Sequence, residues 1–425
     1  MHQLANSVII FDEIQTLPVR CIHLFNIAIR FLVHDCNASV VLCTATQPLL
    51  DQVQPSSRSL QIADDHKIIP NEKELFAQLR RVEAHDKRKV GGWREEEIVE
   101  LALREMEKTD SALVIVNTRK AARSIFEKVN AAQKGKTYHL STNMCAAHRL
   151  CELNEIRAGL ESHVPLVCVS TQLIEAGVDV DFGSVIRTLA GFDRITQAAG
   201  RCNRNGHRER GNVWIVNSDF ENLERLKEIR IGADNATRIL DEFQKTPDRF
   251  EDDLLGLESM RQFFEYYFYA RKAEMAYPTD TRSAIGRNDD LFNLLAQNSL
   301  SDDAYRRVHK QNPKLLLKQS FMSAAKSFRA IETSTRGVLT TYGEGEEIIT
   351  DLCGAFAIER QAGLLRKSQR FTINMFPNEF QAMAETGGIY ETQAGSGIYA
   401  LQKAHYDEQF GWSTDEVSNM ELLIN

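Results

Sequence analysis

Acidic side chains follow a short apolar run close to the beginning of this sequence. Asp12 and Glu13 come directly after "SVIIF" (residues 7–11), a run that is typical of a buried strand. Ligands of open parallel sheets bind at the carboxyl ends of strands, so a carboxylate pair there can act on a phosphate. We assign Asp12 to Mg²⁺, held through water, and Glu13 to the orientation of an attacking water. Taken alone, such a pair is more often a solvated turn.

Basic side chains recur in the segment "QAAGRCNRNG", which carries Gln197, Arg201 and Arg204. Guanidinium groups are planar and always charged, and this suits the charge that develops on a transferring phosphoryl group. Residues three and four apart share a face of a helix, so the three side chains are predicted to converge as catalytic and nucleotide-binding groups. The alternative is a solvated basic helix.

Polar residues also follow apolar runs between these two motifs. "VIVNTRK" ends in Asn117, Thr118 and Arg119 at the expected start of a helix. Helix-start amides and hydroxyls suit a phosphate, including one of a nucleic-acid backbone, although N-capping by Thr118 explains the pattern equally well. "YHLST" repeats the arrangement with Ser141. We assign these four residues to nucleic-acid binding.

The run "VSTQLIEAGVDVDF" places Thr171 after another apolar strand, and we add this threonine to the nucleic-acid-binding residues. Gly177 permits close approach of the backbone to a ligand. Asp179 can accept a hydrogen bond from a ribose hydroxyl or orient an arginine. We assign Gly177 and Asp179 to nucleotide binding.

An α/β scaffold must position these residues. Continuous apolar runs alternate with helical patterns, which indicates parallel sheets covered on both faces. The pattern starts twice, with a break at "DKRKVGGW" (86–93), and gives way to helices and then to short strands. In the helical part, the aromatic run that begins at Phe263 is more often a helix core than a platform for stacked bases.

Composition narrows the class of protein. The net charge of −8 over 425 residues argues against a surface that is basic throughout, while a local basic cleft can still bind nucleic acid. The eight cysteines form no C-x-x-C pair, which favours free buried thiols in a reducing compartment. The segment "CIHLFNIAIRFLV" is too short to span a membrane and no signal peptide is visible, so we expect a cytoplasmic protein without membrane contact.

Taken in order, the motifs resemble a superfamily 2 helicase, with two RecA-like domains and a nucleotide between them. More narrowly, "IIFDEIQTLP", "LCTATQP", "STQLIEAGVDVDF", "QAAGRCNRNG" and the tail segment "LLRKSQRFTINMF" resemble the helicase-nuclease of type I CRISPR interference. The resemblance implies ATP and Mg²⁺ as cofactors, movement along single-stranded DNA, and recruitment by an RNA-guided surveillance complex in antiviral defence. It divides the chain into part of a first RecA-like domain (1–88), a complete second one (94–219), a helical linker (220–336) and a C-terminal accessory domain (337–425).

The sequence departs from that family in three places. No G-x-x-x-x-G-K-[ST] phosphate loop occurs, because the Gly-Lys-Thr at 135–137 has Asn130 where the first glycine is required, and we interpret it as an exposed turn. A single His34–Asp35 pair does not make the ligand cluster of a two-metal nuclease. Gln15 stands where related helicases usually carry His or Asp, and it can still reach the nucleotide by hydrogen bonds.

These departures predict that the chain begins inside the first RecA-like domain and exposes a strand edge there. The first hypothesis is therefore an ATP-dependent single-stranded DNA translocase component that is inactive alone and takes its phosphate loop and nuclease from a separate N-terminal half. The second is a non-catalytic fragment that binds DNA or the surveillance complex. The third, a different superfamily 2 member such as an RNA helicase, is disfavoured by the resemblance of the tail.

Overall fold

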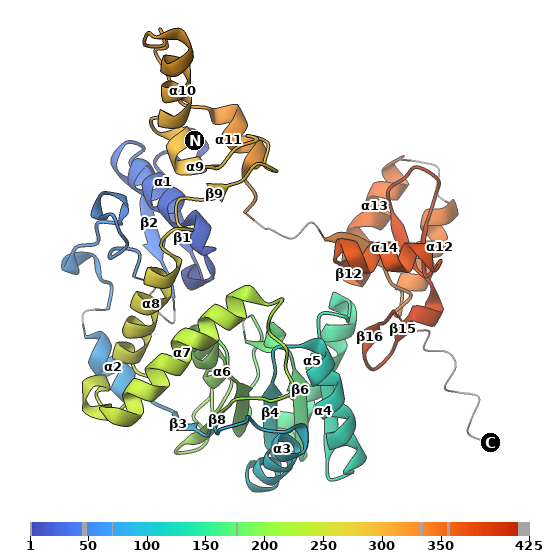
Figure 1. The fold of residues 1–425 in the computed structure, drawn as a ribbon. Helices are drawn as coiled ribbons and strands as arrows, with labels where there is room; N and C mark the ends of the chain where they lie inside the picture. Colours follow the sequence, from blue (N-terminus) through green and yellow to red (C-terminus); the bar gives the residue numbers. More distant parts are fainter. Residues whose placement is uncertain are drawn as a thin grey trace. The chain divides into compact units, whose positions relative to one another are not determined.

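The computed structural model describes residues 2–44, 49–69, 71–175, 177–330, 335–354 and 358–414 (Figure 1). The chain divides into two compact units. The first combines residues 1–79 with 238–332, and the second combines residues 80–237 with 333–425. Each unit therefore joins segments that are far apart in the sequence, and each is described by itself.

A six-stranded parallel sheet forms the centre of the second unit. Its order is β3-β8-β7-β4-β6-β5, and each neighbouring pair runs parallel. The strands are β3 (Val82–Asp86), β4 (Ser111–Ile115), β5 (Lys136–Leu140), β6 (Leu166–Ser170), β7 (Ser184–Thr188) and β8 (Gly211–Val216). Every residue of β4, β6 and β7 is buried, which explains why these strands appear as continuous apolar runs. The predicted α/β class with a RecA-like sheet is confirmed.

Helices connect successive strands of this sheet. They are α3 (Glu95–Thr109), α4 (Arg119–Ala131), α5 (Ala146–Glu161) and α6 (Phe192–Ala199), and α7 (Lys227–Lys245) follows the last strand. Helices α3 and α4 share an apolar core with the sheet that includes Ile98, Val114, Ile125 and Phe126. Three glutamates open α3, where they offset the partial positive charge of the helix N-terminus.

Strand β3 lies before residue 94, where the sequence predicted this α/β unit to begin. It pairs with β8 along its whole length, and Lys87 N beyond it donates to Ile215 O. The strand is hard to recognise because "VEAHD" carries polar side chains at an edge of the sheet. The second unit therefore starts at residue 80.

The C-terminal part of the second unit contains a small mixed sheet and three helices. The sheet has the order β12-β11-β14-β13. Its strands are β11 (Arg336–Leu339), β12 (Thr372–Met375), β13 (Ile389–Glu391) and β14 (Tyr399–Leu401), and its helices are α12 (Gly345–Gly354), α13 (Ile358–Ser368) and α14 (Pro377–Glu385). A short antiparallel pair, β15 (Tyr406–Asp407) and β16 (Gly411–Trp412), follows. The short strands that the sequence predicted after the helical region are present.

This C-terminal part is anchored to the segment that precedes α5. The Tyr406 hydroxyl accepts a hydrogen bond from Cys145 N at 3.1 Å and lies 3.0 Å from His148 Nδ1. Trp412 N donates to Asn143 O at 3.0 Å. Cys145 belongs to the apolar core of the small sheet, so the two parts of the unit share a buried interface.

Two buried histidines lie along this interface. The Phe410 ring packs edge-on against His139, with 5.3 Å between ring centroids, and His148 stacks on Tyr342 at 4.3 Å. Burial lowers the pKa of His139 to about 4, and nearby Arg123 adds to the effect. Burial also lowers the pKa of His148 to about 4. Both imidazoles are therefore neutral at neutral pH.

The first unit contains a two-stranded parallel sheet of β1 (Val8–Phe11) and β2 (Ser39–Leu42). Helix α1 (Ile22–His34) connects the two strands, and the predicted strand-helix-strand order is confirmed. Val8 and Ile10 are 69% and 65% exposed, although strands of parallel sheets are normally covered on both faces. One face of this small sheet is thus uncovered by the described residues.

Besides a short antiparallel pair, β9 (Pro278–Thr279) and β10 (Asp289–Asp290), helices make up most of the rest of the first unit. They are α2 (Glu72–Gln78), α8 (Leu257–Arg271), α9 (Leu291–Leu295), α10 (Ser299–His309) and α11 (Phe321–Ser327). In α8, Phe263 and Phe264 are buried against one another, with ring centroids 5.4 Å apart. The interpretation as core is confirmed for Phe263 and Phe264, whose rings are not available to bases, whereas Tyr269 at the end of the run is 73% exposed. Within the described parts of the chain, no helix is both long and apolar enough to cross a membrane.

Candidate functional site

The carboxyl edge of the six-stranded sheet brings the predicted nucleic-acid-binding residues together. In the register, Ile115 pairs with Ser170, and Ser170 pairs with Leu140, so strands β4, β6 and β5 end side by side. The residues that follow these ends are Asn117, Thr118, Arg119, Ser141 and Thr171. The parallel sheet therefore collects side chains from three separate motifs at one edge, where open α/β sheets bind ligands.

The start of α4 is capped in two ways. Thr118 is the N-cap residue, and its hydroxyl accepts from Ala121 N at 3.3 Å, so the N-capping interpretation is confirmed. Glu221 accepts with one oxygen from Asn117 N at 2.6 Å and from Thr118 N at 2.9 Å. The amides of the two residues ahead of α4, expected to bind a phosphate, are thus bonded to a carboxylate of the chain itself. This contact could not be foreseen from the sequence, because Glu221 lies more than a hundred residues away.

Arg119 is held by residues from two other segments. Its Nη1 donates to Asn143 Oδ1 at 2.5 Å, and its Nη2 is paired with Glu379 of α14. Ser141 accepts from Asn143 N at 3.3 Å and is buried, so its hydroxyl serves the turn after β5. Arg119 remains 37% exposed at its side chain, whereas Ser141 is 1% exposed.

The loop after β6 carries Thr171 and leads into a single turn at Gln172–Ile174. Thr171 is buried, and its Oγ1 has no hydrogen-bond partner among the described residues. Gly177 has φ +69°, a conformation that favours glycine, and an added Cβ would meet open space. The loop therefore contains both a buried free hydroxyl and a backbone that a ligand can approach.

The helix predicted to align Gln197, Arg201 and Arg204 ends too early to do so. Helix α6 stops at Ala199, with Gly200 as the C-cap, and the chain then turns through Asn203 at φ +47°. The shared helical face for the three side chains is therefore wrong. Gln197 lies half-buried in the last turn of α6, and the two arginines follow in the turn beyond it.

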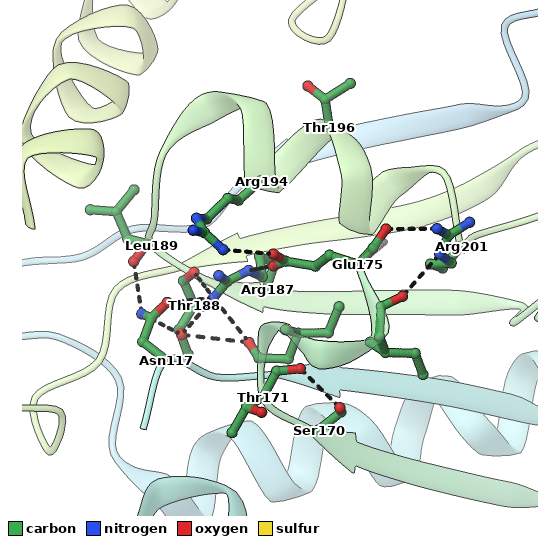
Figure 2. A network of polar contacts seen from close by, with 12 residues as sticks. Asn117, Ser170, Thr171, Glu175, Arg187, Thr188, Leu189, Arg194, Thr196 and Arg201 are labelled. Carbon is green, nitrogen blue, oxygen red and sulfur yellow. Dashed lines mark hydrogen bonds and ion pairs between the residues drawn. The ribbon is translucent and has the colours of Figure 1, made fainter. Parts of the chain in front are cut away.

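Arg201 lies in the interior rather than at a free surface. It is 8% exposed, and its Nε and Nη2 donate to Ile174 O at 3.0 Å and to Glu175 O at 2.6 Å. Its cation thus fixes the loop that follows β6 (Figure 2). Arg201 is thus hydrogen-bonded inside the protein, whereas the motif alone predicted a catalytic cation that contacts the nucleotide.

Arg204 is the accessible arginine of the pair. Its side chain is 43% exposed, and its Nε lies 2.8 Å from Asp179 Oδ1. Two roles were predicted for Asp179, a contact with a ribose hydroxyl and the orientation of an arginine. Its contact with Arg204 corresponds to the second role. Asp181 supports the same turn, because its carboxylate accepts from Arg204 N at 2.6 Å and from Asn205 N at 3.1 Å.

A buried ion pair at the centre of the edge was not identified from the sequence. Arg187 in β7 is fully buried, and its Nε lies 2.8 Å from Glu175 Oε1 (Figure 2). Burial raises the pKa of the Glu175 carboxyl, while the charges of Arg187 and Arg194 oppose the shift. An arginine inside the otherwise apolar run "SVIRTLA" was the available signal, since a buried cation needs a partner.

The same arginine continues the network to the start of α4. Arg187 Nη1 donates to Asn117 Oδ1 at 2.9 Å and to Thr188 O at 2.8 Å. Asn117 Nδ2 in turn donates to Leu189 O at 3.0 Å. Figure 2 shows how these contacts connect the loop held by Arg201 with the segment ahead of α4. The residues that follow β4, β6 and β7 are thus fixed to one another.

The acidic motif lies in the first unit, at the carboxyl ends of β1 and β2. Asp12 and Glu13 are exposed, and Gln15 Nε2 donates to the Glu13 carboxylate. Thr44 Oγ1 donates to Gln15 Oε1 at 2.5 Å, which ties the end of β2 to the acidic motif. Thr46, in the segment "LCTATQP", lies outside the described residues. The acidic motif with Asp12 and Glu13 belongs to the first unit, and the arginines Arg201 and Arg204 belong to the second. Their pairing across a nucleotide stays a prediction.

The remaining expectations concern metal ligands, cysteines and the Gly-Lys-Thr segment. In the part of the chain that the structure describes, no group of three or more His, Cys, Asp or Glu side chains could hold a metal ion. An exposed carboxylate such as Asp12 fits the water-mediated contact that Mg²⁺ makes when phosphates supply its other ligands. His34 ends α1, as predicted, and the eight cysteines are free. Lys136 and Thr137 open β5 after α4, which is the reverse of the order that a phosphate loop needs.

Comparison with known proteins finds similarity to Cas3 proteins over part of the chain. Residues 108–207 match the family model described as "CRISPR-associated nuclease/helicase Cas3, C-terminal". A segment of 78 residues, 17% of this chain, is 44% identical to the CRISPR-associated nuclease/helicase Cas3 of Haloferax volcanii and covers 8% of that protein. The matched range contains the loop after β6 and both arginines of the turn after α6.

Solved Cas3 structures share the fold. The T. fusca Cas3-AMPPNP structure aligns with a TM-score of 0.53 over 87% of this chain and 47% of that chain, at 14% identity. A structure titled "CRISPR RNA-guided surveillance complex, pre-nicking" aligns with a TM-score of 0.50 over 92% of this chain and 53% of that chain, at 13% identity. The chain thus spans about half the length of these two matched chains.

Proposed function

We propose that this Cas3-family chain is the part of an ATP-dependent single-stranded DNA translocase that grips the DNA backbone and supplies an arginine to ATP hydrolysis. The observation that carries the proposal is the common carboxyl edge of β4, β5 and β6, where polar residues from three motifs meet. Arg119 and the amides of Asn117 and Thr118 are proposed to contact the DNA backbone, and the buried Ser141 and Thr171 are proposed to support that edge from the turns after β5 and β6. The four-part division of the chain given above remains part of this proposal.

Arg204 is the proposed arginine finger. It is the more exposed of the two arginines, and Asp179 holds its guanidinium in one orientation. Arg201 acts beside it by fixing the loop after β6, and Gln197 and Gly177 line the approach of the nucleotide. A supplied arginine stabilises charge on the transferring phosphoryl group and accounts for rate increases of about 10³–10⁵ in other phosphoryl-transfer enzymes.

Asp12, Glu13 and Gln15 form the other half of the proposed catalytic set. Asp12 holds Mg²⁺ through water, and Glu13 orients the attacking water. When bound, Mg²⁺ neutralises the phosphate charge of ATP. The hydrogen bonds from Thr44 through Gln15 to Glu13 fix the acidic motif relative to the end of β2.

The phosphate loop and the nuclease are proposed to lie outside these 425 residues, on a polypeptide that completes the first RecA-like sheet. The exposed faces of Val8 and Ile10 support this, because a parallel sheet is stable when further strands and helices cover it. By the same reasoning from the family, the working partner is an RNA-guided type I CRISPR surveillance complex in the cytoplasm, and the role is antiviral defence.

The test mixes this chain with the polypeptide that carries the phosphate loop and measures ATP hydrolysis with and without single-stranded DNA. We expect hydrolysis to rise only when both polypeptides and DNA are present, and single-stranded RNA to stimulate less. Arg210→Ala is the matched control for Arg204→Ala, because Arg210 is exposed and donates to Arg80 O. No rise on mixing would refute the proposed motor.

A non-catalytic role in binding DNA or the surveillance complex is the second candidate. It is favoured by one observation, that the second unit contains a complete six-stranded sheet of its own. Interference that is unchanged by Arg204→Ala, together with DNA binding that is lost in Arg119→Ala, would select this function over the first.

A further inference from the structure

Two carboxylates of the chain occupy the groups proposed to bind DNA phosphates. The first is Glu221, which lies between β8 and α7. Its Oε1 accepts from Asn117 N at 2.6 Å and from Thr118 N at 2.9 Å, and its Oε2 accepts from Asn117 Nδ2 at 3.2 Å and from Ser218 Oγ at 3.1 Å. Four donors contact this one carboxylate, and two of them are the backbone amides of Asn117 and Thr118, immediately ahead of α4.

The second carboxylate is Glu379, which reaches the same turn from the C-terminal part of the unit. It is paired with Arg119, and it is held in place because its Oε2 accepts from Phe376 N at 3.0 Å at the start of α14. The Arg119 guanidinium lies 5.8 Å from the Trp412 ring and bonds Asn143, so its position is also fixed. The amides of Asn117 and Thr118 are thus bonded to the Glu221 carboxylate, and the Arg119 guanidinium is bonded to the Glu379 carboxylate.

A carboxylate and a phosphate diester compete for such donors on the same physical grounds. Both are anions with oxygens that accept from backbone amides, both are favoured by the positive end of a helix, and both pair with a guanidinium. Another anion that takes the place of a carboxylate keeps these donors bonded, whereas amides and an arginine left without a partner are costly.

We propose that Glu221 and Glu379 are built-in competitors for the DNA backbone, so that a single strand binds the second unit only by displacing them. This inference rests on the proposed function of residues 117–119. Glu379 makes the DNA contact depend on the C-terminal part of the unit, and Glu221 makes it depend on the segment that leads into α7. The two carboxylates therefore set how tightly the chain grips DNA.

The experiment measures binding of a short fluorescent oligothymidylate to the full chain by anisotropy, over a series of salt concentrations. Glu221→Gln and Glu379→Gln keep the side-chain shape and an acceptor oxygen and remove the charge. We expect each variant to bind roughly three- to tenfold more tightly and to steepen the salt dependence by about 0.7 for each phosphate gained. The double variant is expected to show the larger effect.

Matched controls remove the same charge nearby. Glu224→Gln lies three residues after Glu221 and bonds Asn222, and Glu385→Gln lies at the other end of α14 and bonds Gln381. Both controls are expected to bind as the unaltered chain does. Melting temperatures show whether each variant is folded, and the two test sites lie on different elements, so a fold defect in one leaves the other informative.

Each outcome is decisive. Equal tightening in the controls overturns the inference, because general charge would then be the cause. Unchanged binding in Glu221→Gln and Glu379→Gln, with weaker binding in Arg119→Ala, also overturns it and leaves the proposed function standing. Absence of binding by the unaltered chain and by all variants refutes the DNA site itself, whereas binding gained only in the two test variants supports the competition.

Discussion

Replacing Arg187 by methionine is expected to destabilise the second unit strongly, because Glu175 then loses its main counter-ion in the protein interior. Arg187 is fully buried, and its Nε lies 2.8 Å from Glu175 Oε1. Removing one partner of a buried ion pair typically costs about 3–5 kcal/mol. Arg194 is a weaker substitute, since its Nη1 is 3.5 Å from Glu175 Oε2. We expect the free energy of unfolding to fall by about 3 kcal/mol.

The loss is expected to depend on pH, and its direction follows from Glu175. Burial already raises the pKa of this carboxyl, and removal of Arg187 takes away an opposing charge, so the pKa in the folded variant rises further. A carboxyl whose pKa rises on folding contributes stability below its unfolded pKa of about 4.3 and loses it as the pH rises through the folded value. The difference between Arg187→Met and the unaltered chain is therefore largest above neutral pH and shrinks on acidification.

Urea unfolding followed by tryptophan fluorescence measures both effects. Lys134→Met is the control, because Lys134 and Glu107 form an exposed pair at 52% and 54% side-chain exposure, worth less than about 1 kcal/mol. The double variant Glu175→Met with Arg187→Met is expected to recover part of the loss, since it leaves no unpaired buried charge. A loss below about 1 kcal/mol for Arg187→Met, or one that grows on acidification, would contradict the reasoning.

Three further outcomes are expected. Tyr406→Phe is expected to lower stability by about 1–3 kcal/mol in thermal melting, because Cys145 N loses its acceptor, and Tyr305→Phe in α10 is the control. Burial lowers the pKa of His139 and of His148 to about 4, so between about pH 6.5 and pH 4 these side chains take up protons in the unfolded chain but stay neutral in the folded one. The free energy of unfolding is therefore expected to drop by up to about 3 kcal/mol for each histidine as the pH falls through this range. A flat stability between those pH values would contradict this assignment. Arg204→Ala is expected to reduce DNA-stimulated ATP hydrolysis of the mixed polypeptides by about 10³, and an equal loss in Arg210→Ala would remove its special role.

The central sheet could be predicted because its strands are buried on both faces. "SALVI", "LVCVS" and "SVIRT" form β4, β6 and β7, and their apolar runs leave few other interpretations. The edge strand β3 was harder to predict. Its sequence "VEAHD" is only partly buried, so it can carry polar residues and lacks a continuous apolar run. Strands that are less buried are therefore harder to recognise from the sequence.

The candidate site was predictable in its members but not in its contacts. Gly200 after "TQAA" is a common helix stop, and it ends α6 before Arg201, so this error could have been avoided. The pairing of Arg187 with Glu175 and of Glu221 with Asn117 could not be foreseen, since each depends on which strand ends the sheet places side by side. Sequence spacing fixes neighbours along a helix, whereas these contacts arise from tertiary structure.

The anchoring of Tyr406 and Trp412 near α5 has a consequence for how the polypeptide is made. The large sheet begins at residue 82, yet most of the core neighbours of Cys145 are residues beyond 337. A ribosome therefore has to synthesise the whole of the first unit's second segment before the last buried surfaces of the second unit can close. Contacts of such long sequence separation form late, so the surface around Cys145 stays open to chaperones and proteases until the residues beyond 337 have been made.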